Sequence, residues 1–164
     1  MQINSTHTYL ISVHPRWASA FFLSHNPKSI ELRKGSFGAS LKPGDTVAIY
    51  ATMPTAELLG TVRVLKRETH PIDRLWRASE QGKLARVTRQ QFDAYYCNQS
   101  SGVGVWVEAA ELFPSPITLC KLRQTWGHRW QPPQQIQQLN DDRISALNID
   151  NTTERYVVRH YLTV

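Results

Sequence analysis

Cysteine is scarce in this sequence, and long hydrophobic runs are missing. Cys97 and Cys120 are the only two cysteines in 164 residues, and they lie far apart in the chain. This usage excludes a disulfide framework and predicts free thiols. No apolar run approaches membrane-spanning length, and the first residues show no cationic stretch followed by an apolar one. We therefore expect a cytoplasmic protein without a membrane partner.

Signatures of metal, cofactor and nucleophile chemistry are missing as well. The histidines show no H-x-x-x-H or other ligand spacing, and no C-x-x-C pair is present, so we expect no metal. No Gly-rich phosphate loop and no dinucleotide-binding glycine pattern occurs, so we expect no cofactor. Ser12, Cys97 and Cys120 lie in no nucleophile-elbow context, which argues against a serine or cysteine triad.

Positive charge, by contrast, is in excess. The formal net charge is +6 and the sequence pI is near 9.6. The length and the 41% of hydrophobic residues fit one soluble domain with a sizeable core. A positive field concentrates phosphates around a molecule, so the charge favours an anionic partner. Many basic proteins bind no particular anion, so charge alone leaves the partner open.

The pattern of elements mixes strands with short helices. Strands are expected at residues 8–14, 30–33, 46–51, 58–65 and 102–113. Helices are expected from Pro15 to about Ser24 and at 72–78, 88–96 and 119–124, with Thr88 as an N-cap. Gly60 is a candidate bulge within its strand.

The last third of the chain carries more proline and more polar residues. Pro114 and Pro116 are expected to end the strand that begins at residue 102. Pro132 and Pro133 open a further expected helix that ends near Leu139. Beyond it the chain turns polar and acidic, and the apolar stretch at 156–162 is interpreted as a terminal strand or docking segment.

A short motif of charged and aliphatic residues, Asn26–Arg33, carries most of the functional signal. If the motif ends in a strand, Ile30 and Leu32 face a core because successive side chains alternate. Glu31 and Arg33 then share the other face. Lys28 belongs to the preceding turn, where its ammonium can swing toward Glu31. Such a cluster suits a nucleobase and its phosphate; the alternative is a solvated face with an exposed ion pair worth well under about 1 kcal/mol.

The motif and three further segments resemble the ASCH family, a branch of the PUA-like β-barrel superfamily. The family signature is written G-x-K-x-x-E-x-R, and Lys28, Glu31 and Arg33 fall on its charged positions. Asn26 stands where the family has glycine, a mild departure because asparagine tolerates a left-handed backbone. The other similar segments, within about residues 9 to 139, are Leu10–Pro15, Pro43–Tyr50 and Gln131–Gln134.

This resemblance implies an α+β fold, a PUA-like small β-barrel of about five to six strands with flanking helices. Residues 1–140 would form one ASCH/PUA-like domain. Residues 141–164 would form a polar linker and a C-terminal segment that packs on the same domain. The oligomeric state stays open.

The resemblance also implies nucleic-acid binding. PUA-like domains generally bind RNA or DNA, and several subfamilies hold a flipped or modified base between the first helix and the barrel. The expected partner is therefore RNA or another single-stranded nucleic acid, with RNA favoured, or a modified nucleobase or nucleoside. Arg33 would contact a phosphate or carbonyl, while Glu31 would accept from a base edge or hold Lys28. Further pocket residues suggested by the resemblance are Ser12, His14 and Tyr50.

A catalytic alternative comes from similar families, some of which are small amidohydrolases acting on N4-acetylcytidine with a lysine, a threonine and a glutamate. Lys28 matches the lysine, but Glu31 stands at the threonine position. No carboxylate lies between residues 80 and 93, where the glutamate is expected. Lys28 as nucleophile or base, with Glu31 handling protons, is chemically possible. Ribonuclease activity, as reported for some ASCH proteins, would use a similar cationic cleft, and whether this protein is an enzyme stays open.

A second cluster, at residues 121–130, interleaves cationic side chains with two indoles. Arg129 and Trp130 are its candidate binding residues, because cations follow a phosphate backbone and an aromatic face stacks a splayed base. The alternative is that Trp126 and Trp130, four residues apart, cap the core. A third function class, a protein-interaction domain that uses its aromatic surface, also stays open.

Overall fold

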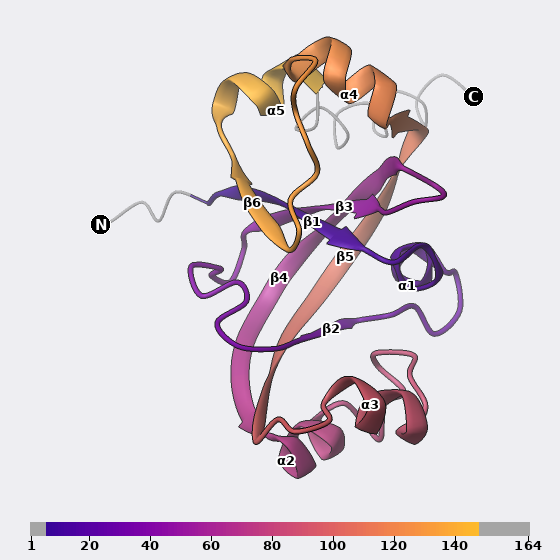
Figure 1. Ribbon diagram of the computed structural model, residues 1–164, viewed down its shortest axis with the longest axis vertical. Coiled ribbons are helices and arrows are strands. Elements are labelled where there is room, and N and C mark those ends of the chain that lie inside the picture. The colour runs from indigo at the N-terminus through magenta and orange to yellow at the C-terminus, as the bar shows by residue number, and fades with distance from the viewer. Residues whose placement is uncertain (1–5, 148–164) are drawn as a thin grey trace, which may run out of the picture.

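The computed structural model describes residues 6–147, and these residues form one mixed six-stranded sheet (Figure 1). Its strands lie in the order β2-β5-β4-β3-β1-β6. β1 pairs with β3 in parallel, and the other neighbours are antiparallel. The strands are β1 (Thr8–Val13), β2 (Ile30–Arg33), β3 (Thr46–Ala51), β4 (Glu57–Pro71), β5 (Ser101–Thr118) and β6 (Ile136–Leu139).

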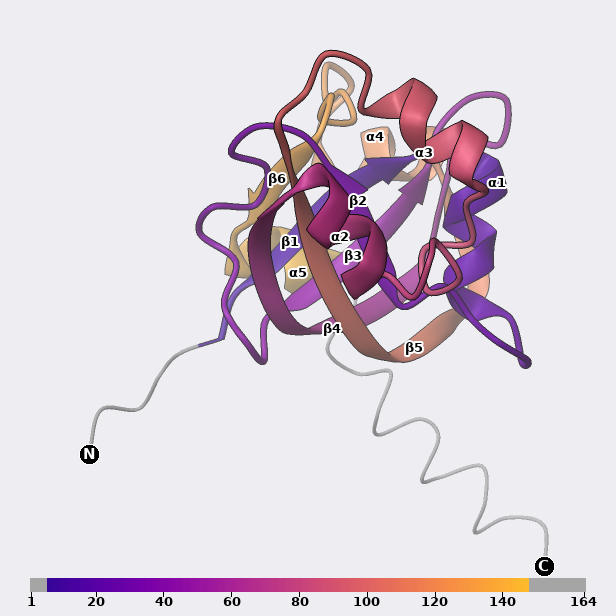
Figure 2. The ribbon, with the colours of Figure 1, turned by 90° about the horizontal axis from the view of Figure 1, so that it is seen from below.

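The sheet is open, which corrects the expected closed barrel. The edge strands β2 and β6 are only four residues long, and they pair with β5 and β1 rather than with each other. The long strands β4 and β5 curl strongly (Figure 2), and their ladder shifts register three times. Bulges of this kind increase local bending. The curl brings the edges toward each other without a hydrogen-bonded closure between the strands described.

Five α-helices and one 3₁₀ helix decorate the described sheet. They are α1 (Pro15–Ala18), η1 (Ser19–Phe22), α2 (Ile72–Ala78), α3 (Arg89–Tyr95), α4 (Leu119–Trp126) and α5 (Asp141–Leu147). Figure 1 shows α2 and α3 at one end of the β4–β5 ladder and α4 and α5 at the other. Between residues 6 and 147, no helix has the length and apolar character to cross a bilayer.

Local signals place several elements where the sequence predicts them. α2 follows Pro71 directly. α3 begins after Thr88, whose side chain accepts from the Gln91 N–H while the Gln91 side chain caps the Thr88 N–H in return. The helix expected from Pro15 to Ser24 is shorter, because its α turn passes into η1 and Leu23 is already extended.

Alternation along β3 divides the core between the two faces of the sheet, as predicted. Val47 and Ile49 belong to one buried cluster, and Ala48 and Tyr50 belong to another. Helices and loops therefore cover both faces at the sheet centre, and neither side of β3 is open to solvent. A site on this sheet has to lie at an edge or beyond a strand end.

Pro114 and Pro116 do not end β5, which corrects the sequence prediction. Leu58 and Gly60 of β4 pair with Ile117 and Leu112 of β5, so residues 113–116 stand opposite Leu59 alone. Both prolines lie in this bulge, where a strand tolerates a residue that has no N–H to donate.

The helix expected after Pro132 and Pro133 is also wrong, because the chain there stays extended and forms β6. β6 runs antiparallel to β1, with Ile136 opposite Ile11. The otherwise unpaired edge of β1 offers hydrogen bonds that outweigh the weak helical pattern.

The chain after Leu139 differs from the expected polar linker where it is described. Residues 141–147 form α5, which packs against α4. The apolar stretch at 156–162, interpreted from the sequence as a terminal strand or docking segment, lies outside the described residues.

Candidate functional site

The charged motif folds into β2 and the turn that precedes it. Asn26 adopts a left-handed backbone with φ of 48°, the conformation that suits the glycine of the family signature. The Lys28 N–H then donates to the Ala20 carbonyl at 2.8 Å, which ties the turn to η1. β2 pairs only with β5 among the described strands, so Glu31 and Arg33 lie at an edge of the sheet.

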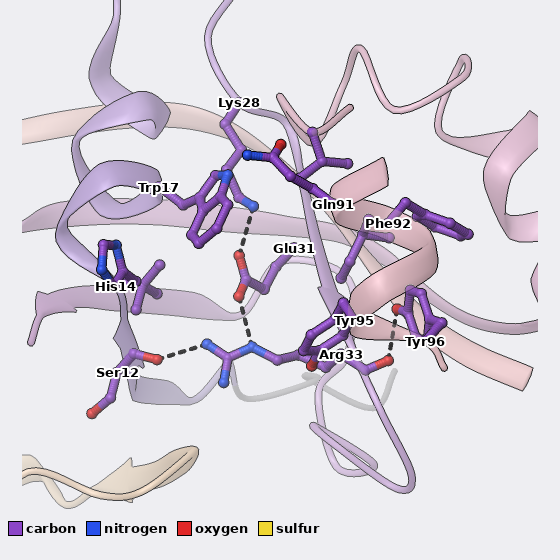
Figure 3. A pocket seen from close by; sticks show the side chains of 13 residues that line it. Ser12, His14, Trp17, Lys28, Glu31, Arg33, Gln91, Phe92, Tyr95 and Tyr96 are labelled. Atoms are coloured by element: carbon purple, nitrogen blue, oxygen red, sulfur yellow. Dashed lines mark hydrogen bonds and ion pairs between the residues drawn. The ribbon is translucent and has the colours of Figure 1, made fainter. Parts of the chain in front are cut away.

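The three charged side chains converge, as Figure 3 shows. Lys28 Nζ lies 3.1 Å from Glu31 Oε2, and Arg33 Nε donates to Glu31 Oε1 at 2.6 Å. Arg33 Nη2 donates to the Ser12 carbonyl at 2.6 Å. Lys28 and Glu31 are each only 5% exposed. The geometry therefore excludes the alternative of an exposed ion pair on a solvated strand face.

The charge state of this triad follows from its burial. Burial alone would raise the pKa of the Glu31 carboxyl, but the Lys28 and Arg33 charges outweigh it and hold the pKa below its ordinary value. Glu31 Oε2 sits near Lys28 Nζ, yet it accepts no well-aligned hydrogen bond from any described residue. The triad therefore carries one excess positive charge and one buried acceptor that is incompletely satisfied.

A cavity of about 240 Å³ opens beside the triad, and aromatic side chains form much of its wall. Trp17 contributes from α1, while Tyr95 and Tyr96 contribute from α3 and the residue after it (Figure 3). We call it the triad cavity. Its lining residues are Ser12, Val13, His14, Trp17, Lys28, Glu31, Leu32, Arg33, Val87, Gln91, Phe92, Tyr95 and Tyr96.

The wall that α3 provides is one that sequence reasoning missed. Tyr96 is buried, its hydroxyl donates to the Arg33 carbonyl at 2.9 Å, and burial raises its pKa. Tyr95 is 40% exposed, and Lys34 Nζ lies 4.5 Å from its ring centroid. The spacing of Phe92, Tyr95 and Tyr96 was an available signal, since residues three and four apart share one helix face. Nothing local showed that this face would meet β2.

The expected neighbours from the end of β1 do lie at the cavity, with different roles. Ser12 lines it, but its hydroxyl donates to the Pro133 carbonyl at 2.6 Å and only its carbonyl contacts Arg33. His14 is exposed at the N-cap of α1, where Nδ1 accepts from the Arg16 N–H. The His14 ring also packs edge-on against Trp17.

The remaining candidates, Tyr50, Arg129 and Trp130, do not line the triad cavity. Tyr50 and Trp130 belong to the core cluster on the other face of β3, with their ring centroids 6.4 Å apart. Burial raises the pKa of the Tyr50 hydroxyl, against a smaller opposing effect of Arg123. Arg129 is exposed on the segment after α4.

We define the indole cluster as Trp126, Trp130 and the cations Lys121, Arg123 and Arg129. Its two rings and Arg123 have partners within the cluster or on neighbouring residues. The two indoles stack edge-on with centroids 4.9 Å apart. Trp126 Nε1 donates to the Arg143 carbonyl at 3.1 Å, and Arg123 Nε donates to the Trp130 carbonyl at 3.1 Å. Trp130 is 7% exposed. Its indole therefore caps the core.

The fold, but not the sequence as a whole, has clear relatives. No protein-family model and no curated protein matches the chain. Among solved structures, the ASCH protein of Zymomonas mobilis matches with a TM-score of 0.77 and 22% identity, over 87% of this chain and 94% of that chain.

More distant structures share the same arrangement. The N-terminal domain of Staphylothermus marinus McrB matches with a TM-score of 0.56 and 9% identity, over 87% of this chain and 93% of that one. Human THYN1, in complex with DNA that contains 5-methylcytosine, matches with a TM-score of 0.52 and 13% identity, over 87% and 95%. These likenesses establish the architecture, and they agree with the resemblance of the β2 motif: the chain has the fold of the Zymomonas mobilis ASCH protein.

Proposed function

We propose that this protein is a nucleic-acid-binding module that takes one unpaired or modified base into the triad cavity, with single-stranded RNA as the favoured ligand. The observation that carries the proposal is the Lys28–Glu31–Arg33 triad, in which Lys28 and Glu31 are buried and which borders a cavity between aromatic side chains. At about 240 Å³, the cavity is smaller than the roughly 300–1,000 Å³ of drug-sized ligand pockets. A single planar heterocycle fits that scale.

The polar groups of the cavity match the edge of a base. Glu31 lines the cavity, and a carboxylate accepts well from an exocyclic amine such as cytosine N4. Arg33 Nη1 has no hydrogen-bond partner within residues 6–147, so it is free to donate to a base carbonyl or a phosphate. Desolvation makes each of these hydrogen bonds costly to lose once a ligand is bound.

The aromatic side chains supply the sequence-tolerant part of the affinity. Trp17 and Tyr95 lie on different sides of the triad in Figure 3. Stacking a splayed base on such a ring contributes about 1 to 3 kcal/mol. Single-stranded RNA is commonly bound in this way, with bases stacked on aromatic rings and hydrogen-bonded at their edges. THYN1 in complex with DNA supports a nucleic-acid ligand for the fold in general.

The catalytic alternative has less support from the geometry. Lys28 and Arg33 hold the pKa of Glu31 below its ordinary value, and a carboxylate with a low pKa is a weak general base. Lys28 Nζ is directed toward Glu31 and the Ala85 carbonyl. Hydrolysis of acylated nucleosides and cleavage of RNA stay predictions, and Lys28→Ala tests both by loss of any released product.

The binding proposal is tested by fluorescence anisotropy with labelled octamers of RNA, of DNA and of an abasic backbone. We expect the base-containing strands to bind at least about fivefold more tightly than the abasic one, the lower limit of one stacked base. Contact with about three phosphates gives a log-log salt slope near −2 for a single strand. Equal affinity for abasic and base-containing strands, or affinity independent of salt, would contradict the proposal.

A further inference from the structure

A second, larger hollow adjoins the triad cavity, and we infer that it carries the sugar-phosphate strand that flanks the bound base. We call it the basic groove. It has a volume of about 680 Å³ and lies between the α1–η1 segment and the loop of residues 79–88. This inference rests on the proposed function and deepens it, because it makes the ligand a polynucleotide rather than a free nucleoside.

The two hollows share one wall. Trp17, Val87 and Gln91 line both the triad cavity and the basic groove. A base that stacks against Trp17 would therefore have its sugar at the junction of the two. The next part of a strand would leave the cavity past these three shared residues and enter the groove.

The charge of the basic groove fits phosphates. Arg16, Lys83 and Arg86 line it, and Glu80 is its single lining carboxylate among the described residues. Arg16, Lys83 and Arg86 are exposed, so their charges are available to a ligand. None of the three forms an ion pair with a described carboxylate. The other lining side chains are apolar or neutral and polar, which suits sugars and bases.

The loop of residues 79–88, which forms one wall of the groove, is held in its conformation by buried contacts. Gly82 N donates to the Ser79 hydroxyl at 3.1 Å, and that hydroxyl donates to the Trp76 carbonyl at 2.8 Å. Gly82 has φ of +78°, and a Cβ there would collide with the Val87 carbonyl and the Trp76 ring. Only glycine fits this position without a shift.

The same loop is tied to both neighbouring elements. Arg86 Nη1 donates to the Asn26 carbonyl at 2.8 Å, and Trp17 Nε1 donates to the Arg86 carbonyl at 3.4 Å. The Ser29 N–H donates to the Leu84 carbonyl at 2.8 Å. The groove therefore exists before a ligand arrives, and a strand that binds it does not have to order the loop first.

Size and position together favour a polynucleotide over other anions. A free nucleoside would occupy the triad cavity and leave the larger groove empty. The carboxylates of an acidic peptide would satisfy the cations, but these side chains offer no planar ring to the cavity between the aromatic rings. A single strand with one base in the cavity uses both hollows.

The test compares two groove variants, Lys83→Glu and Arg16→Glu, with the matched control Lys42→Glu. Lys42 is also exposed and lines neither hollow. It lies just before the first residue of β3, and the triad cavity lies toward the other end of that strand. Arg86 is left unchanged, because its side chain holds the turn at Asn26. The probes are a single-stranded RNA octamer, the nucleoside cytidine and an octamer of glutamate, and thermal melting confirms that each variant is folded.

We expect each groove variant to bind the RNA octamer about fivefold more weakly at 0.1 M salt, since each lost single-strand contact removes a factor of about [salt]^−0.7. The salt slope should fall by about 0.7 per variant. The control should stay within about twofold of the wild type, and cytidine should bind all variants alike. If the groove variants weaken the octamer no more than Lys42→Glu does, the inference is wrong.

The other outcomes separate this inference from the function on which it rests. The glutamate octamer could bind as tightly as RNA and lose the same affinity in the groove variants. That result would identify an acidic peptide as the ligand of the groove and overturn the inference. Loss of RNA affinity in the groove variants, with no effect of Tyr95→Ala, would support the groove and overturn the base-binding cavity. Cytidine binding without extra affinity for the octamer would support the cavity and overturn the groove.

Discussion

The triad cavity and the indole cluster contain the same kinds of side chain but use them differently. Each combines aromatic rings with cations, and by sequence each is a candidate nucleic-acid surface. In the indole cluster, the ring N–H of Trp126 and the guanidinium of Arg123 find partners among neighbouring residues. In the triad cavity, Glu31 and Arg33 line an open volume, and Arg33 Nη1 has no hydrogen-bond partner among the described residues.

This difference shows what separates a structural cluster from a candidate binding site. Aromatic and cationic residues that satisfy one another stabilise the fold, because packing and hydrogen bonds are already complete. The same residues around an empty, polar-edged cavity leave interactions for a ligand. Variants of the two regions should therefore separate stability from binding.

Glu31→Gln should have the largest effect, because it acts on stability and on binding together. Removing the carboxylate charge leaves Lys28 and Arg33 beside each other without compensation, and breaking a buried ion pair costs about 3–5 kcal/mol. Urea unfolding measures the loss, and anisotropy on the folded protein measures the weaker binding. A variant with unchanged stability would show that the triad is more hydrated than the 5% exposure of Lys28 and Glu31 indicates.

The difference in free energy of unfolding between the wild type and Glu31→Gln should depend on pH in one direction. The pKa of Glu31 lies below its ordinary 4.5 in the folded protein, so the unfolded chain binds more protons near this pH. The stabilisation is therefore complete above about pH 4.5 and is lost as the pH falls through the folded-state pKa. The free energy of unfolding of the wild type should approach that of Glu31→Gln in acid. A difference that widens on acidification would contradict the assignment.

Trp130→Ala should destabilise the protein by about 3–5 kcal/mol, the usual cost of deleting a buried large aromatic side chain. Its ring packs against Tyr50 and Trp126, away from the triad cavity. RNA affinity of the folded variant should therefore stay within about twofold of the wild type. A large loss of affinity in a folded variant would show that the indole cluster takes part in RNA binding.

Tyr95→Ala should weaken RNA binding and leave stability nearly unchanged, which is the reverse of the result expected for Trp130→Ala. Tyr95 lines the triad cavity and is 40% exposed, so truncating its side chain creates little buried empty space in the core. Losing one stacking ring costs about 1–3 kcal/mol of binding, or about 5- to 150-fold in Kd. Tyr95→Phe is the matched control and should retain most of the affinity. Equal binding by Tyr95→Ala and the wild type would place the base elsewhere.

Lys121→Glu should have the smallest effect. Lys121 is exposed on α4, and surface substitutions of this kind change stability by less than about 0.5 kcal/mol. If the indole cluster takes no part in binding, RNA affinity should change no more than in other surface charge reversals such as Lys42→Glu. A reduced salt slope specific to Lys121→Glu would show that phosphates reach α4.

Several elements could be predicted because short-range chemistry decides them. Thr88 and Gln91 form their capping box within four residues of chain, and the alternation of β3 follows from the backbone itself. The strand at Ile30–Arg33 and the approach of Lys28 to Glu31 were predictable for the same reason.

The wrong predictions concern elements that depend on distant partners. β5 continues through Pro114 and Pro116 because β4 offers a bulge there, and β6 forms because the edge of β1 needs a strand. The closed barrel fails for a related reason, since closure requires both edge strands to reach each other. None of these conditions is visible within a window of ten residues.

By itself, the sequence determined which groups carry charge, which face of β2 they share and that no cysteine framework or metal spacing is present. The tertiary structure alone decided which aromatic-cationic cluster surrounds an empty volume. That volume exists because Trp17 and Tyr95, 78 positions apart in the chain, come to line one cavity beside β2. Local backbone geometry sets the direction of a side chain, but a cavity needs side chains from distant segments to meet without filling the space between them.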